Sequence, residues 1–248
     1  MNYSLAIITY FTEDILNRGR FALFKESIDS LLKSNFLNTI FIVDDHSTVN
    51  THLDYISSLQ DNRLKIFKRD YNGGASKAYN TGIRLILESG CDYGFLANDD
   101  LVYMKDWFIP YLEVVTTTKI KHLSFFSETW TSDVEVSFSK NQINIENKLL
   151  NSYSYAQGGL LTFSKEMIDK IGYFKIMPYK FGHEHGNFSI RAIYHGFSVG
   201  FLDVVNSNNL LKYADDSGTI TTRDSNFRSS ADVNLPFLLS LTYEPCIE

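Results

Sequence analysis

The amino-acid sequence predicts an α/β fold, in which helices cover both faces of a mixed, mainly parallel central sheet. A continuous apolar run at Ser4–Phe11 is typical of a buried central strand. Apolar residues then recur at helical spacing from Phe21 to Leu32, and a second apolar run follows at Thr39–Val43. Strand, helix and strand in this order form a βαβ unit, whose strands are parallel and whose connection is right-handed.

The following segments continue this alternation of helices and strands. Apolar spacing predicts further elements in chain order: a helix at Leu53–Leu59, a strand at Leu64–Phe67, a helix around Ile83–Leu87, a buried strand at Tyr93–Ala97, and a hairpin formed by Val134–Phe138 and Ile143–Ile145. The segment Thr12–Arg20 is polar and is expected to be a loop.

The composition is that of one ordinary folded domain. The chain has 248 residues, of which 44% are hydrophobic and 21% charged. A net charge of −6 offers no basic surface for nucleic acid, so no nucleic-acid partner is expected. Cys91 and Cys246 are the only cysteines, which excludes a disulfide framework and a zinc cluster. No apolar run reaches about 18 residues, and no basic segment precedes one, so we expect a soluble, cytoplasmic protein.

Two carboxylates follow the strand predicted at Tyr93–Ala97. The strand ends in Asn98, Asp99 and Asp100, so the carboxylates stand at the end of a buried element. Hard oxygen ligands suit Mg²⁺ or Mn²⁺, which bind one or two carboxylates together with substrate phosphates. The alternative is a solvated turn, in which Asn and Asp are common.

Other polar residues end the neighbouring strands or open a helix. Thr9 and Tyr10 end the first strand, and Asp45 follows the second. Ligands of parallel sheets lie beyond the carboxyl ends of the strands, so these residues are expected at one edge. Adjacent glycines at Gly73–Gly74 precede a helix. They indicate either a site where the backbone and the helix N-terminus bind a phosphate, or a simple turn into the helix. The spacing is not that of a dinucleotide-binding loop.

Together these segments resemble the inverting nucleotide-sugar glycosyltransferases of family 2, which have the GT-A fold. The matching segments, in order, are Thr9–Tyr10, Val43–Ser47, the N-x-G-x-x-x-A-x-N-x-G pattern of Asn72–Gly82, the D-x-D-type Asn98–Asp100, Gln157–Phe174 and Glu184–Arg191. Each segment is weak alone, but their order and spacing make the set specific.

The resemblance implies a role for each residue of these segments. Thr9, Tyr10 and Asp45 would hold the nucleotide base, which is expected to be uracil. Asn72, Gly74, Lys77 and Asn98 would also bind the nucleotide, with Lys77 near a phosphate. Asp99 would contact the ribose or metal-bound water, and Asp100 would be the direct ligand of Mn²⁺ or Mg²⁺.

The segment that carries the catalytic base departs from the family pattern. Counting back from Arg191 places Glu184 at the Glu of the family's E-D pair, so His185 stands where relatives have the Asp that deprotonates the acceptor hydroxyl. An imidazole titrates near neutrality unaided, whereas Glu184 needs a raised pKa or a strong field. The sequence leaves both open, with a slight preference for Glu184. His183 and His185 are alternatively orienting, metal-binding or structural residues.

The resemblance also implies one domain with distinguishable parts. Residues 1–103 would form a Rossmann-like nucleotide-sugar-binding half, residues 104–205 an acceptor and catalytic half, and residues 206–248 a loop and tail. The polar stretches Asn206–Asn209 and Asp215–Gly218 predict a mobile loop. The apolar tail Leu235–Leu239 is expected to pack on the domain; homo-oligomerisation and peripheral contact with a membrane are the alternatives.

The expected function is metal-dependent, inverting transfer of a sugar from a UDP-sugar to a hydroxyl of a glycan or lipid-linked glycan. Such a reaction serves polysaccharide or surface-glycan biosynthesis, in the cytoplasm or at the inner face of the membrane. A sugar-phosphate nucleotidyltransferase is the competing enzyme, but no basic G-G-x-G-x-R loop follows the first strand. A carbohydrate- or nucleotide-sugar-binding protein that has lost the chemistry is the competing binding module, which the His185 departure leaves open.

Overall fold

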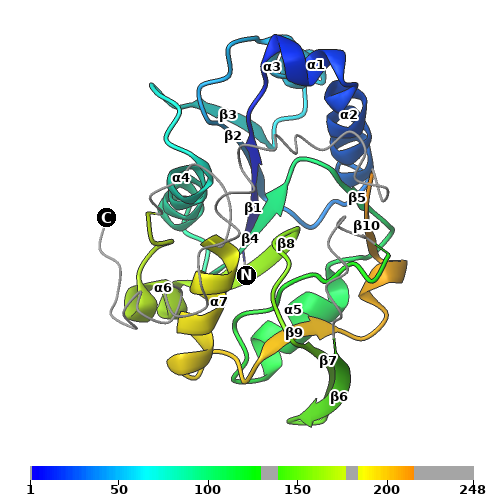
Figure 1. The fold of residues 1–248 in the computed structure, drawn as a ribbon, viewed down its shortest axis with the longest axis vertical. Helices are drawn as coiled ribbons and strands as arrows, with labels where there is room; N and C mark the ends of the chain where they lie inside the picture. Colours follow the sequence, from blue (N-terminus) through cyan, green and yellow to red (C-terminus); the bar gives the residue numbers. More distant parts are fainter. Residues whose placement is uncertain (1, 130–138, 177–183, 215–248) are drawn as a thin grey trace.

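The computed structural model describes residues 2–129, 139–176 and 184–214, and within them it confirms the predicted mixed α/β architecture (Figure 1). A five-stranded sheet has the order β3-β2-β1-β4-β8, with β8 antiparallel to β4 and the other neighbours parallel. Its strands are β1 (Tyr3–Thr9), β2 (Thr39–Asp44), β3 (Leu64–Lys68), β4 (Tyr93–Asn98) and β8 (Leu160–Ser164).

Helices cover both faces of this sheet because consecutive residues of a strand point to opposite sides. Leu5 and Ile7 of β1 belong to one apolar core, and Ala6 belongs to the other. The first core also contains apolar residues of α2, α3 and α5, and the second those of α4, α6 and α7. The helices are α1 (Glu13–Asn17), α2 (Arg20–Leu31), α3 (Thr51–Ser58), α4 (Ala75–Glu88), α5 (Ile109–Thr117), α6 (Lys165–Ile171) and α7 (Glu184–Tyr194).

The register of the parallel strands brings their carboxyl ends to one edge. Thr9 of β1 pairs with Asp44 of β2, and Ile8 pairs with Asn98 of β4. The predicted convergence of the strand ends is therefore confirmed. Gly82 of α4 allows this helix to lie close to β1, since a Cβ at Gly82 would meet the Cβ of Ala6 at 2.9 Å.

Smaller sheets complete the described residues. One has the order β6-β7-β9, and the other pairs β10 with β5; their strands are β5 (Leu101–Tyr103), β6 (Lys140–Ile145), β7 (Lys148–Tyr153), β9 (Phe201–Val204) and β10 (Leu211–Tyr213). Ile143–Ile145 lies in a hairpin as predicted, but its partner is β7, because Glu146 and Asn147 form a tight turn with positive φ. Val134–Phe138, its predicted partner, lies outside the described residues.

Two segments that the sequence assigned to loops contain short helices. The predicted loop Thr12–Arg20 contains α1, whose N-cap Thr12 accepts a hydrogen bond from the backbone N–H of Ile15. The predicted mobile loop Asn206–Asn209 contains a turn of 3₁₀ helix at Ser207–Asn209. Ser207 is buried, so this segment packs on the domain. Asp215–Gly218, the tail Leu235–Leu239 and His183 lie outside the described residues. No helix in the described ranges is long and apolar enough to span a membrane.

A buried histidine ties α7 to the central sheet. The Nδ1–H of His122 donates to the carbonyl of Thr162 at 2.9 Å, so its Nε2 accepts from the hydroxyl of Ser189 on α7 at 2.7 Å. Burial lowers the pKa of His122 to about 4. The folded protein therefore holds this imidazole neutral at pH 7.

The pH dependence of stability tests this arrangement. The unfolded chain protonates His122 near pH 6.5, whereas the folded chain does so only near pH 4. Between these values the unfolded state binds more protons. The contribution of His122 to the unfolding free energy therefore decreases as the pH is lowered from 6.5 to 4, by about 3 kcal/mol in total. Burial raises the pKa of Asp203 to about 6, which makes the contribution of Asp203 to stability change with pH in the opposite direction.

Urea unfolding of wild type and His122→Gln across this pH range isolates the contribution of the histidine. We expect a shallower loss of stability on acidification in the variant, and parallel curves would contradict the assignment.

Candidate functional site

Asp45 anchors the glycine loop at the carboxyl edge of the sheet. Its Oδ1 accepts hydrogen bonds from Arg69 Nη1 at 2.7 Å and from the N–H of Gly73 at 3.1 Å, and its Oδ2 accepts from the N–H of Gly74 at 2.8 Å. Gly74 has a φ of 82°, a conformation that other residues rarely adopt. The backbone N–H of Asp45 donates to the carbonyl of Thr9 at 2.9 Å. Asp45 thus holds the end of β1 through its backbone N–H and the start of α4 through its carboxylate.

Lys77 and Arg69 flank an exposed tyrosine next to this loop. Lys77 Nζ donates to the hydroxyl of Tyr71 at 3.3 Å and lies 5.1 Å from the centre of its ring. The guanidinium carbon of Arg69 lies at the same distance, 5.1 Å, from that centre. Tyr71 is 52% exposed, and Tyr10 is 39% exposed. The edge therefore offers aromatic side chains and cations to a ligand, but the sequence pointed only to Tyr10 and Lys77.

Three polar atoms at the ends of β1 and β4 and in the glycine loop are buried without a hydrogen-bond partner among the described residues. They are Thr9 Oγ1, Asn72 Oδ1 and Asp100 Oδ1. Buried polar atoms in native proteins are nearly always hydrogen-bonded, so atoms of this kind indicate a ligand or water. All three belong to residues that the sequence predicted for donor or metal binding.

Asp99 and Asp100, here called the acidic pair, form the turn between β4 and β5. Both are buried, and both accept hydrogen bonds from Arg20, with Arg20 Nη1 2.9 Å from Asp100 Oδ2 and Arg20 Nη2 bonded to Asp99 Oδ1. Burial raises the pKa of Asp99; Arg20 opposes this shift, and Asp100 adds to it. Burial also acts to lower the pKa of Arg20, but the two carboxylates outweigh it and raise that pKa above its ordinary value.

The acidic pair fits a divalent cation of the predicted kind. Asp100 Oδ1 is a buried carboxylate oxygen without a partner, which is a suitable hard ligand for Mn²⁺ or Mg²⁺. The described residues contain no group of three or more His, Cys, Asp or Glu side chains that could form a complete metal cage. As far as the described residues go, a cation here would complete its coordination with substrate and water, as Mg²⁺ commonly does.

Tyr79 connects the acidic pair with the predicted catalytic segment. Its hydroxyl donates to Asn98 Oδ1 at 2.6 Å, and its ring centre lies 4.9 Å from that of His185 in an edge-to-face arrangement. Glu184 begins α7, and its Oε1 lies 3.3 Å from His185 Nδ1. Glu184 is buried, and His185 is partly exposed. The structure thus brings Glu184 and His185 to the same edge as Asn98 and the acidic pair.

His185 presents one ring nitrogen without a partner. Nε2 is buried and has no hydrogen bond within the described ranges, whereas Nδ1 faces Glu184. Burial lowers the pKa of His185, although Glu184 opposes the shift, so the imidazole is neutral near pH 7. A neutral imidazole with a free nitrogen is able to accept a proton.

Gly158 leaves the space that the His185 ring occupies. A Cβ at Gly158 would lie 1.9 Å from His185 Nδ1 and 2.1 Å from Cε1, so any larger residue displaces the ring. Gly158 does not have the positive φ that restricts other residues, so an alanine there acts mainly through this clash.

If His185 is the base that the sequence allows, Gly158→Ala should lower kcat by roughly 10²-fold, because a small misplacement of a catalytic group has effects of this size. Donor affinity, measured by calorimetry, should stay near the wild-type value. Gly90→Ala, at a position where a Cβ would meet nothing within 4 Å, controls for glycine replacement, although its positive φ of 79° adds strain. Wild-type turnover in Gly158→Ala would contradict the placement of His185.

Comparison with known proteins identifies the family. The model of glycosyl transferase family 2 matches residues 6–180. An uncharacterised glycosyltransferase of Acanthamoeba polyphaga mimivirus is 32% identical over 213 residues, which cover 86% of this chain and 81% of the relative. The family match ends before α7, so the description of the catalytic segment depends on the geometry above.

Solved structures share the fold. The mannosyltransferase PcManGT of Pyrobaculum calidifontis, in complex with GDP-Man and Mn²⁺, has a TM-score of 0.55 and 13% identity, over 79% of this chain and 52% of its own. Residues 1–349 of S. aureus TarS, in complex with UDP, have a TM-score of 0.52 and 16% identity, over 77% of this chain and 55% of that one. The chain spans about half the length of these two proteins. Identities this low show the GT-A fold alone, whereas the family model and the viral relative establish that the chain belongs to glycosyl transferase family 2.

Proposed function

We propose that this glycosyltransferase moves a hexosyl or N-acetylhexosaminyl group from a UDP-sugar to a hydroxyl of a glycan or lipid-linked glycan, with inversion and with help from a divalent cation. The main supporting observation is Asp100 Oδ1, a buried carboxylate oxygen without a partner in the described residues. It stands at the edge where the Asp45-anchored glycine loop begins α4. Residues 1–103 serve the donor, and residues 104–205 serve the acceptor.

The nucleotide is assigned to the edge formed by β1, β2 and the glycine loop. Thr9, Tyr10 and Asp45 bind the uracil, and Asn72, Gly74 and Lys77 follow along the ribose and diphosphate. Asp45 already accepts three hydrogen bonds, but a carboxylate has about four acceptor sites, so it is still able to accept from the uracil ring N–H. TarS has been solved with UDP and with UDP-GlcNAc, and PcManGT with GDP-Man, which supports a nucleotide-sugar donor.

The acidic pair is assigned to the cation. Asp100 binds it directly, and Asp99, together with Asn98, borders the ribose. A divalent cation bound there supplies charge neutralisation to the departing diphosphate. PcManGT has been solved with Mn²⁺, which supports a cation of this type.

The base is assigned to His185, with Glu184 behind it. Glu184 Oε1 lies beside Nδ1, which favours the tautomer that carries the proton on Nδ1 and leaves the lone pair on Nε2. The His185 side chain is 15% exposed and that of Glu184 only 2%, so His185 is the more accessible to an acceptor. For this reason we prefer His185 to Glu184, although the sequence alone slightly favoured Glu184.

The reaction then proceeds by one displacement. The acceptor hydroxyl oxygen forms a bond to the anomeric carbon while the bond from that carbon to the diphosphate oxygen breaks. Nε2 of His185 takes the hydroxyl proton, and UDP leaves with the bonding electron pair. Attack from the face opposite the leaving group inverts the anomeric configuration.

A donor panel tests this function. Purified protein is incubated with Mn²⁺ and with UDP-, GDP- and ADP-sugars, and the released nucleoside diphosphate is measured. We expect release from UDP-sugars and its loss in EDTA. Release of pyrophosphate from a sugar phosphate and UTP would identify a nucleotidyltransferase instead. Tight donor binding without any release or transfer would identify a binding module.

A further inference from the structure

Arg20, from a distant part of the chain, forms ion pairs with both carboxylates of the acidic pair. It is the first residue of α2, some 80 residues before Asp99 and Asp100, and the Arg20 side chain is 14% exposed. One guanidinium nitrogen is bonded to each carboxylate. Such a two-pronged contact is among the stronger ion pairs in proteins. The local charge is therefore −1, from two carboxylates and one guanidinium.

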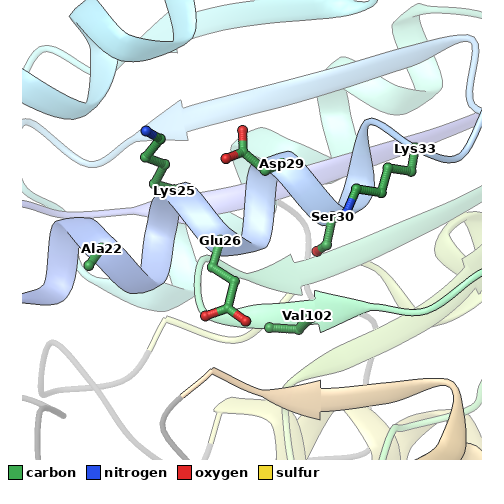
Figure 2. Close-up of a pocket in the computed structure, with 7 residues that line it drawn as sticks. All are labelled: Ala22, Lys25, Glu26, Asp29, Ser30, Lys33 and Val102. Carbon is green, nitrogen blue, oxygen red and sulfur yellow. The ribbon is translucent and has the colours of Figure 1, made fainter.

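The position of Arg20 is unfavourable for its own helix. A helix N-terminus carries partial positive charge and favours acidic side chains, yet the first turn of α2 contains no acidic residue. Figure 2 shows α2 lying along β5, the strand that follows the acidic pair, and Ser30 Oγ of α2 accepts a hydrogen bond from the N–H of Tyr103 at 3.0 Å. This contact holds the backbone of α2 beside β5, so a separation of Arg20 from the acidic pair would have to come from rotation of its side chain.

A divalent cation and Arg20 cannot share the acidic pair without cost. Arg20 engages Asp99 Oδ1 and Asp100 Oδ2, which leaves Asp100 Oδ1 as the buried oxygen without a partner. A dication on that carboxylate would lie a few ångströms from a guanidinium in a buried site, where like charges repel strongly. A dication bound by Asp100 Oδ1 therefore favours departure of the guanidinium from the acidic pair.

We propose that Arg20 is an internal counter-ion of the acidic pair, which the divalent cation displaces and which then binds the diphosphate of the donor. The proposal rests on the donor and cation sites of the proposed function. A guanidinium released at this edge meets a diphosphate, whose oxygens match its planar fork. Cation and nucleotide consequently bind with positive coupling, because the displacement that opposes the cation alone is compensated when the diphosphate accepts Arg20.

The test compares Mn²⁺ binding with and without nucleotide in wild type, Arg20→Ala and Arg20→Gln. Free Mn²⁺ is measured by electron paramagnetic resonance, and UDP binding in Mn²⁺ by calorimetry. Without UDP, we expect both variants to bind Mn²⁺ about 10-fold more tightly than wild type, a size ordinary for coupled sites. In saturating Mn²⁺, both should bind UDP about 10-fold more weakly. A general loss of structure is not expected to strengthen Mn²⁺ binding and weaken UDP binding in the same variant.

Thermal unfolding supplies an independent readout. Without metal, the melting temperature of both variants should fall, because two buried carboxylates lose their counter-ion. Mn²⁺ should raise it more than in wild type, since a ligand that binds only the folded state stabilises it. Arg18→Ala is the matched control: Arg18 lies two residues away and pairs with Asp14 on the surface, so all three measurements should match wild type.

Other results would overturn the proposal while separating it from the proposed function. Mn²⁺ binding that is unchanged or weaker in both Arg20 variants contradicts displacement, even if Asp100→Asn shows that the metal site exists. If the wild type turns over in EDTA and Arg20→Gln does not, Arg20 permanently takes the place of the cation. This result would leave the proposed glycosyl transfer intact but contradict the displacement of Arg20. Absence of Mn²⁺ binding in every protein rejects both the displacement and the metal site.

Discussion

Replacing His185 with Ala should lower kcat by roughly 10²–10⁴-fold, the usual contribution of a positioned general base. UDP and Mn²⁺ should bind as in wild type, because Nε2 of His185 faces neither in the proposed arrangement. Glu184→Gln should cost less, since it removes only the charge beside Nδ1 and not the nitrogen that takes the proton. Single-turnover rates with a working donor and acceptor, measured beside donor affinity, separate these effects.

The pH profile gives a second test of the base. Burial lowers the pKa of His185 below its ordinary value near 6.5, and the base must be unprotonated. The kcat should therefore fall as the pH drops through this lowered pKa, so the midpoint of the acidic limb should lie below pH 6.5. In His185→Ala this acidic limb should disappear from the residual activity. If Glu184→Gln is the more severe variant, Glu184 is the base, and near-normal turnover in both variants rejects a catalytic role for α7.

Asp100→Asn should abolish Mn²⁺-dependent donor binding. Metal neutralisation of a diphosphate contributes several kcal/mol, so UDP affinity in Mn²⁺ should fall about 100-fold, to the wild-type value in EDTA. The folded state should tolerate the change, with a loss of about 1–3 kcal/mol in unfolding free energy, because Asn keeps the shape of the side chain and Arg20 keeps its bond to Asp99.

The control for Asp100→Asn is Asp92→Asn, an exposed carboxylate just before β4. Calorimetry with UDP in Mn²⁺ and in EDTA measures both variants. Wild-type UDP affinity in Asp100→Asn with Mn²⁺ present would remove the cation from the mechanism.

The fold was predictable because its signals are local. The continuous apolar run of β1 reflects burial on both faces, since Leu5 and Ile7 enter one core and Ala6 the other. The helical spacing of Phe24, Ile28 and Leu31 likewise marks the buried face of α2. These patterns depend only on neighbouring residues, which a single sequence contains in full.

The unpredicted elements depend on contacts between distant segments. β10 has three residues, and it forms a strand because Leu211 pairs with Tyr103 of β5, more than a hundred residues earlier. Such a short segment has no periodicity of its own. Within the described residues Ile143–Ile145 pairs with β7, which the sequence did not predict, because the turn at Glu146–Asn147 joins the two strands.

The candidate site divides in the same way. Asp45, Asp100 and Glu184 could be proposed from the sequence because each lies in a short segment with a recognisable order of residues. Arg20 and Arg69 were missed because each acts on a carboxylate remote in sequence, and a lone arginine in a polar segment has no distinguishing signal. Gly158 belonged to a recognised segment, but its role appears only when His185 is placed against it.

The measurement that tests the central claim most directly is the anomeric configuration of the first sugar released from a nucleotide-sugar donor. Proton NMR follows an α-linked UDP-sugar as water replaces the acceptor, so the natural acceptor need not be known. The account predicts that the β-anomer forms first, together with UDP, and that EDTA and Asp100→Asn both abolish its formation. First appearance of the α-anomer, or equal rates with and without EDTA, would contradict metal-dependent inverting transfer at this site.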